Sequence, residues 1–148
     1  MLPERTRHRR MERLGRLRSG EERLARLRLQ EALASRLQAE ERVALCRAAY
    51  REIMVSANER LKGVIDLTRL PLVQLMVSDA RRAMHHAETA LLAASKVVQN
   101  RQAEWQTARQ AERVMERAVE NAGTALHRAV ERVEQGRIDE VVTLRFGR

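Results

Sequence analysis

The chain has 148 residues, of which 29 are basic and 20 acidic, so its formal net charge is +9. Ala, Glu, Lys, Leu and Arg fill 85 positions, a composition typical of coiled coils and long helices. A single cysteine excludes an intramolecular disulfide and a cysteine-rich zinc site, and no apolar run approaches the ~20 residues of a membrane span. We therefore expect a soluble protein of a reducing compartment.

The N-terminal segment is rich in arginine. Residues 1–28 contain ten arginines against four glutamates. Gly15 and Gly20 would each cost about 1 kcal/mol in a helix, whereas Ser19 and Glu22 have the spacing of a capping box. The sequence thus predicts a frayed basic arm over residues 1–18 and a first helix over residues 19–63.

The first helix carries an apolar stripe with alternating spacings of three and four residues, which is typical of a coiled coil. It begins near Ala25, and its expected core residues include Val43, Tyr50 and Ile53. Four leucines follow a different phase: Leu14, Leu17, Leu24 and Leu27. This difference predicts a stutter in the heptad pattern near residues 24–29.

A short turn is expected over residues 64–71. Lys62 and Gly63 read as a last helical turn and its left-handed cap, and Pro71 suits the first turn of the next helix. Because this turn lies near the middle of the chain, the predicted fold is all-α: a long antiparallel two-helix coiled-coil hairpin forming one domain. A turn centred near Arg69 would place Ala25 close to Arg113, and both termini would meet at one end.

The second helix, over residues 72–135, has the more regular stripe. From Val73 to Val133 only Arg101 and Glu112 interrupt the apolar spacing. Seven large residues on this stripe form the expected core, with Trp105 interpreted as core packing. They are Met84, Leu91, Val98, Trp105, Met115, Val119 and Leu126.

The tail, residues 136–148, changes character. It follows Gly136, and residues 138–146 are rich in β-branched side chains without heptad spacing. Two interpretations stay open: a frayed helical tail, or a strand that forms only against a partner.

The residue types offer little catalytic chemistry. His8, His85, His86 and His127 have no metal-binding spacing, and Cys46 lies on the stripe without a candidate base. The chain has neither a phosphate-binding GxxxxGK[ST] loop nor a GxSxG motif, and a two-helix hairpin lacks a concave pocket. We therefore predict no enzymatic activity, no cofactor and no metal.

Two surfaces carry more apolar or basic residues than a hairpin without partners would need. Apolar residues crowd the turn end, and such patches mark partner sites. The basic arm would suit an acidic protein, nucleic acid or anionic lipid. Nucleic acid is disfavoured because only three aromatic residues could stack on bases, and a membrane role beyond peripheral contact is disfavoured because Met11, Leu14 and Leu17 are few large apolar residues.

The C-terminal residues carry a family resemblance. Glu134, Gln135, Ile138, Asp139 and Glu140 follow an E-Q-x-x-hydrophobic-D-E pattern, and Arg145 and Phe146 close it with a basic-aromatic pair. Together with a long basic hairpin, this ending resembles the FliJ family of flagella and the YscO-like proteins of virulence type III secretion. The chain differs from that pattern in having two lysines and a glycine at position 136.

The resemblance implies a non-enzymatic stalk of a type III export apparatus. Its termini would enter a hexameric export ATPase, and its apolar tip would face the export gate protein. By position, Arg9, Arg10, Arg13 and Arg16 would contact the ring, and Leu67, Leu70, Leu72 and Leu75 the gate. Secretion chaperones are further candidate partners. The resemblance also implies a cytoplasmic location at the inner face of the bacterial membrane.

Two alternatives stay open beside the stalk. A generic coiled-coil scaffold or chaperone adaptor would be a dimer or larger, because exposed flanks such as Leu33 and Leu37 would seek another chain. A nucleic-acid-associated rod would bind DNA with an affinity that falls steeply with salt. The stalk hypothesis predicts a monomer, because the two helices of one hairpin cover each other's apolar stripes. We call this contact between the two stripes the seam.

Overall fold

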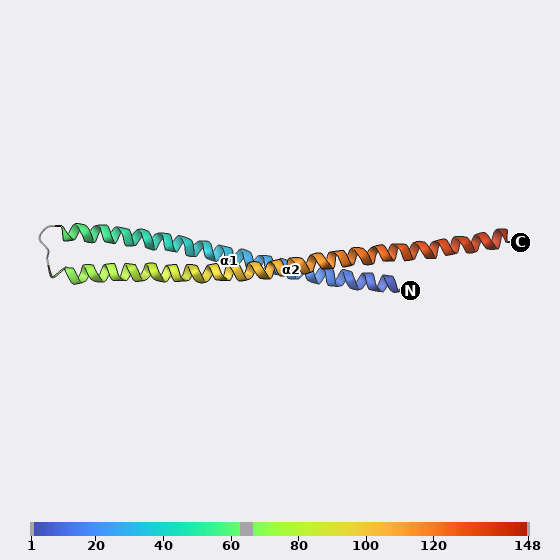
Figure 1. Cartoon of the computed structure of the whole chain (residues 1–148), viewed down its shortest axis with the longest axis horizontal. Coiled ribbons are helices and arrows are strands. Elements are labelled where there is room, and N and C mark those ends of the chain that lie inside the picture. The colour runs from blue at the N-terminus through green and yellow to red at the C-terminus, as the bar shows by residue number, and fades with distance from the viewer. Residues whose placement is uncertain (1, 63–66, 148) are drawn as a thin grey trace. The chain divides into compact units, whose positions relative to one another are not determined.

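The computed structural model describes residues 2–62 and 67–147. These residues form two long helices, α1 from Pro3 to Leu61 and α2 from Leu70 to Phe146 (Figure 1). The expected all-α two-helix hairpin is confirmed. The expected cap at Gly63 lies outside the described residues, as do Val64 and Ile65 of the apolar turn.

The chain divides into two compact units, each an antiparallel pair of helical segments. Unit 1 comprises Met1–Arg26 and Glu104–Arg148, and unit 2 comprises Leu27–Ala103. The seam of unit 2 is apolar, with six buried side chains: Ala32, Val43, Ala57, Val73, Ala87 and Val98. Among residues 2–26 and 104–147 of unit 1, the buried apolar side chains are Ala122 and Ala129, and Glu22 is a buried polar residue.

Both helices extend further than the sequence predicted. α1 begins at Pro3, so residues 3–18 are helical rather than frayed, and Gly15 and Gly20 lie inside the helix. α2 continues through Gly136 to Phe146, which corrects both the predicted end at residue 135 and the alternative of a strand. Long runs of good helix formers outweigh the roughly 1 kcal/mol cost of each glycine, and close packing against Val119 of α2 adds to this at Gly15. Pro71 lies in the first turn of α2, as expected.

The helix register differs from the predicted one. The paired residue numbers add to 131 for Ser19 with Glu112, and to 135 for Arg47 with Glu88. The predicted pairing of Ala25 with Arg113 would require 138. The difference arises because the helices end at Leu61 and restart at Leu70, so the turn is centred before Arg69.

The stripe of α1 keeps a single phase into unit 1, so the predicted stutter is wrong. Residues at seven-residue intervals lie on the seam from Val43 back through Leu29 and Glu22 to Gly15. Leu17, Leu24 and Leu27 are about half exposed instead. The same face that packs in unit 2 therefore also packs in unit 1, although its residues there are less apolar.

The two ends of the helix pair do not coincide within unit 1. Every described residue of α2 from Glu131 onward is exposed, and Figure 1 shows the end of α2 continuing beyond the start of α1. We call residues 131–146 the overhang. Both ends of the chain lie in unit 1, but the register offsets them: pairing sums of 131 to 135 set Leu2 opposite residues 129–133, and α2 continues from there to Phe146.

Candidate functional site

The basic arm is a helical surface. Arg9, Arg10, Arg13 and Arg16 are all exposed on α1 in unit 1. Arg16 also borders a hollow of about 440 Å³ between the helices, where Gly15 and Ser19 leave space beside Val119. A helix displays its arginines at fixed angles, so the arm presents a defined positive surface to a partner.

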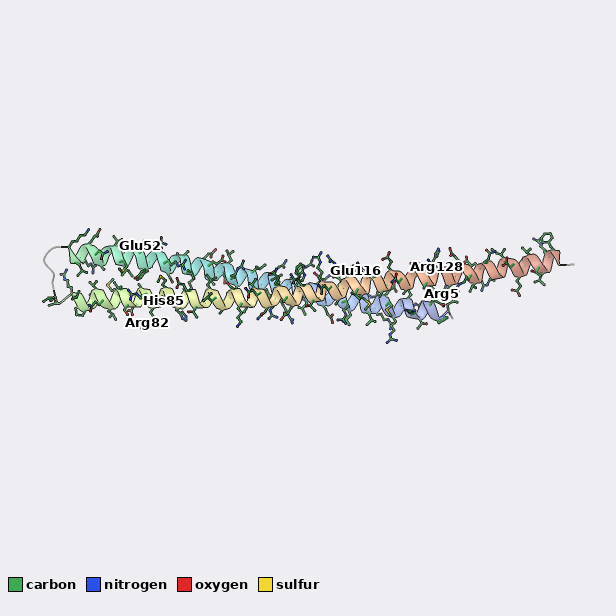
Figure 2. The ribbon with its side chains drawn as sticks, viewed as in Figure 1. Arg5, Glu52, Arg82, His85, Glu116 and Arg128 are labelled. Carbon is green, nitrogen blue, oxygen red and sulfur yellow. The ribbon has the colours of Figure 1, made fainter. Side chains whose placement is uncertain are left out.

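A second hollow lies where α1 begins. It has a volume of about 770 Å³ and is lined by residues from both helices. The lining residues are Glu4, Arg7, Ala125, Arg128, Glu131, Arg132 and Gln135. Figure 2 labels Arg128 on α2 and Arg5 on α1, which belong to this part of unit 1. One carboxylate oxygen of Glu4 is buried without a hydrogen-bond partner, although three arginines line the same hollow.

A polar layer crosses the seam of unit 1. The indole N–H of Trp105 donates a hydrogen bond of 2.9 Å to Glu22, whose side chain is buried. The guanidinium of Arg109 lies 5.3 Å from the centre of the Trp105 ring, within cation–π range. One turn away, the Ser19 hydroxyl donates to Glu112 at 2.9 Å. Trp105 is thus both a seam residue and a hydrogen-bond donor.

Sequence reasoning missed the partner of Trp105. It placed Trp105 on the seam but assigned the α1 leucines near residue 24 to a different phase. Counting back from Leu29 in steps of seven reaches Glu22 and then Gly15. That spacing was the available signal, and it was obscured because the seam positions are polar while the flanking ones are leucine.

The predicted gate-contacting leucines surround the start of α2. Leu67, Leu72 and Leu75 have more than half of their surface exposed, whereas Leu70 is half-buried. Beside them a hollow of about 210 Å³ opens between the helices of unit 2. Ile53, Ala57, Val73 and Met76 give it apolar walls, and the polar residues Glu52, Ser56 and Arg60 complete the lining.

An ion-pair cluster links the helices of unit 2. Arg47 of α1 contacts one oxygen of Glu88 through two nitrogens, at 2.9 and 3.1 Å, and His85 lies 3.5 Å from the other oxygen. The Arg47 hydrogen bond is the main cause that lowers the pKa of the Glu88 carboxyl, with smaller contributions from the charges of Arg47 and His85. The pair is exposed, so it contributes to register more than to stability.

The ten predicted core residues lie along the seams of the two units. Val43 and Val98 are buried. The other eight are half-buried: Tyr50, Ile53, Met84, Leu91, Trp105, Met115, Val119 and Leu126. Partial burial is the geometric limit of a two-helix seam, in which each side chain is covered from one side.

The remaining candidate groups do not converge. His8 is half-buried against Gly123, whereas His85, His86 and His127 are exposed. Among residues 2–62 and 67–147, no group of three or more His, Cys, Asp or Glu side chains could hold a metal ion. In the same part of the chain, neither helix contains an apolar stretch long enough to cross a membrane.

Comparison with known sequences gives one family. The sequence model described as the flagellar FliJ protein matches residues 7–148. No curated protein and no solved structure matches the chain. The match covers all of α2 and all of α1 except its first turn, so it extends over the basic arm, the seams and the overhang.

Proposed function

The chain belongs to the family of the flagellar FliJ protein, and we propose that it is the stalk that couples a hexameric export ATPase to the membrane export gate. The family match supports a role in flagellar protein export, in a family of non-catalytic export components. The proposal adds a mechanism. The helix pair contacts the export ATPase through its basic arm and the export gate protein through its apolar turn. Such a coupling element needs stiffness and two distinct surfaces, and no reaction of its own.

The observation that supports this proposal most is the arm. Four exposed arginines lie on a continuous helix, and in the described part of unit 1 no buried residue is larger than alanine apart from Glu22. A charged helix pair of this kind suits the lumen of a protein ring, where contacts must be made and released repeatedly. Surface ion pairs are weak individually, which allows such exchange.

The proposed gate contact is the turn end of unit 2. Leu67, Leu72 and Leu75 expose apolar surface that the helix pair itself does not cover. Burying exposed leucine is worth roughly 1.5–3 kcal/mol for each side chain, so a few of them can anchor a partner. We further propose a single hairpin as the form that acts in the apparatus, at the inner face of the bacterial membrane, with secretion chaperones as additional partners.

The test measures ATP hydrolysis by the purified hexameric export ATPase with and without the chain. The wild type should stimulate hydrolysis, and Arg9→Glu/Arg13→Glu should abolish the stimulation because it reverses the charge of the arm. The matched control is Arg51→Glu/Arg82→Glu, which makes the same charge change on exposed positions of unit 2. Equal stimulation by both variants, or none by the wild type, would contradict the ring contact.

The gate contact has its own test. Leu72→Asp/Leu75→Asp should lose binding to the cytoplasmic domain of the export gate protein in calorimetric titration. Leu92→Asp is the control, because Leu92 is an even more exposed leucine of α2 and lies away from the turn. Unchanged binding by the Leu72/Leu75 variant would overturn the assignment of the tip.

A further inference from the structure

α1 carries a second apolar stripe on the side that faces away from α2. We call it the outer stripe, and its members are Leu17, Gly20, Leu24 and Leu27, which alternate at the three- and four-residue spacings of a coiled coil. Each member lies two positions along α1 from a seam residue, which is about 200° around the helix. The seam residues concerned are Gly15, Glu22 and Leu29. The three leucines of the outer stripe have between 49% and 57% of their surfaces exposed.

The shape of the outer stripe fits a helix. Charged residues border it on both sides, and an apolar stripe confined to the core heptad positions is typical of a coiled-coil contact rather than of a helix lying on a bilayer. A Cβ at Gly20 meets no atom within 4 Å, so the space between Leu17 and Leu24 is open. In a coiled coil, such a space receives one large side chain of the facing helix.

Three arginines border the outer stripe. Arg16 and Arg23 lie on one side of it, Arg28 lies on the other, and all three are exposed. They occupy the heptad positions that determine partner choice in coiled coils. The fourth bordering position is Glu21, whose carboxylate contacts Arg18 at 2.8 Å. The border is therefore mainly positive, and the facing helix has to supply the negative charge.

The outer stripe of a second copy does not supply that charge. In an antiparallel pairing each border meets the same border of the other copy, so the side with Arg16 and Arg23 faces itself. In a parallel pairing the two borders meet each other, which opposes Arg23 to Arg28. Arg16 alone would gain a carboxylate there, that of Glu21, which Arg18 already contacts.

We propose that the outer stripe is the docking site for an acidic amphipathic helix of another protein. This helix sets a large apolar side chain over Gly20 and places glutamates or aspartates beside Arg16, Arg23 and Arg28. It adds a third helix to the pair without separating α1 from α2, because the seam lies on the other side of α1. The contact does not depend on the proposed stalk function.

The experiment uses a synthetic peptide with leucine at the core heptad positions and glutamate at the flanking ones. It carries a fluorophore and is titrated with the full-length chain by fluorescence anisotropy. A comparison peptide has the same composition in an order without heptad spacing. The wild type should bind the heptad peptide at least about tenfold more tightly than the comparison peptide, because only the former presents an apolar stripe.

Two paired variants locate the contact. Leu17→Gln/Leu24→Gln should weaken binding of the heptad peptide at least about tenfold without changing the charge of the chain. Leu45→Gln/Leu92→Gln makes the same change at leucines of unit 2 that are 71% and 73% exposed, and it should bind as the wild type does. All four positions are exposed, so circular dichroism should show equal helical content in both variants.

A charge exchange tests the border. Arg23→Glu/Arg28→Glu should lose the acidic peptide and bind a peptide with lysine in place of each glutamate, which the wild type should not bind. Arg51→Glu/Arg82→Glu is the matched control in unit 2 and should retain the preference of the wild type. The dissociation constant of the wild type for the acidic peptide should also rise with added salt.

Three results would overturn the proposal. Equal affinity of the wild type for the two acidic peptides would show that charge alone attracts them, and unchanged binding by Leu17→Gln/Leu24→Gln would place the peptide elsewhere. If the chain binds phosphatidylglycerol vesicles or itself through these leucines, but not the heptad peptide, the outer stripe belongs to a membrane or a second copy. The peptide titration and the ATPase assay have different readouts and keep different residues intact, so the two proposals can fail separately.

Discussion

Glu22 and Trp105 meet inside the seam of unit 1, where the buried carboxylate accepts the indole N–H at 2.9 Å. A buried carboxylate is costly unless it is hydrogen-bonded, and a polar pair within a seam restricts the helices to the register in which the two partners meet. This pair therefore specifies how α1 aligns with α2 in unit 1, where few apolar contacts could do so.

Replacing Glu22 should expose that dependence. Glu22→Ala leaves the Trp105 N–H without its partner, so we expect the free energy of unfolding to fall by about 1–3 kcal/mol. Glu22→Gln retains an acceptor oxygen in the same place and should lose less. Urea unfolding followed by helical circular dichroism and by Trp105 fluorescence measures both. If the alanine variant were as stable as the glutamine variant, the hydrogen bond would have no structural role.

Glu88 and Arg47 give a pH-dependent contact in unit 2. The lowered pKa of the Glu88 carboxyl means that the folded state binds its proton less readily than the unfolded state. The contribution of this pair to stability is therefore present above the pKa of the unfolded chain and is lost as the pH falls through the folded-state pKa.

Arg47→Met should raise the pKa of Glu88 toward its usual range, because the main cause of the lowering is removed. Arg51→Met, at an exposed arginine of the same helix, is the control and should leave that pKa unchanged. The pKa of Glu88 in each variant is measured by following the NMR signal of its carboxyl carbon as the pH is changed. An identical titration curve in the wild type and Arg47→Met would show that the bridge does not form in solution.

At the scale of the helices, the seam spacing was predictable and the ends were not. The stripe of α2 from Val73 to Leu126 lies on the seam as the spacing indicated, because a heptad repeat places its members on one face whatever the partner. The start of α1 was misjudged because Gly15 and Gly20 were weighed by local propensity alone. Their cost is small beside that of unpairing a whole helical segment.

The two glycines of the arm differ in what surrounds them. A Cβ at Gly20 meets no atom within 4 Å, whereas a Cβ at Gly15 would lie 3.3 Å from Cγ2 of Val119. We expect Gly20→Ala to raise the free energy of unfolding by about 0.5–1 kcal/mol, because alanine loses less backbone freedom on folding. Gly15→Ala should raise the free energy of unfolding by less than Gly20→Ala does, or should lower it, because the side chain of Val119 must move. Thermal unfolding of both variants tests this. If Gly15→Ala stabilised the chain more than Gly20→Ala, the close approach of α1 to α2 at Gly15 would be refuted.

At the scale of the whole molecule, the two units have different seams. Unit 2 buries Val43, Val73 and Val98 among its alanines, whereas the seam of unit 1 contains Gly15, Glu22 and Glu112. Since buried apolar surface supplies most of the stabilisation of a helix pair, the arm should open more often than the helices of unit 2.

Hydrogen exchange can measure this difference. Amides of α1 before Arg26 should exchange faster than those around Val43, and the addition of a bound partner should slow the arm selectively. Peptides from both regions are compared by mass spectrometry in the same sample, so each serves as the control for the other. Uniform protection along α1 would mean that the polar seam is as stable as the apolar one.

The residues by themselves determined two long helices, the spacing of the seam and the basic arm, because these depend on composition and on a periodicity that is local to each helix. Only the tertiary structure decided the register, the extent of α1 and α2, and the face of the arm that packs. Register depends on the turn length and on pairs such as Glu22 with Trp105, which lie far apart in the chain. The overhang follows from that register, since a pairing shifted by a few residues changes which part of α2 lacks a neighbour.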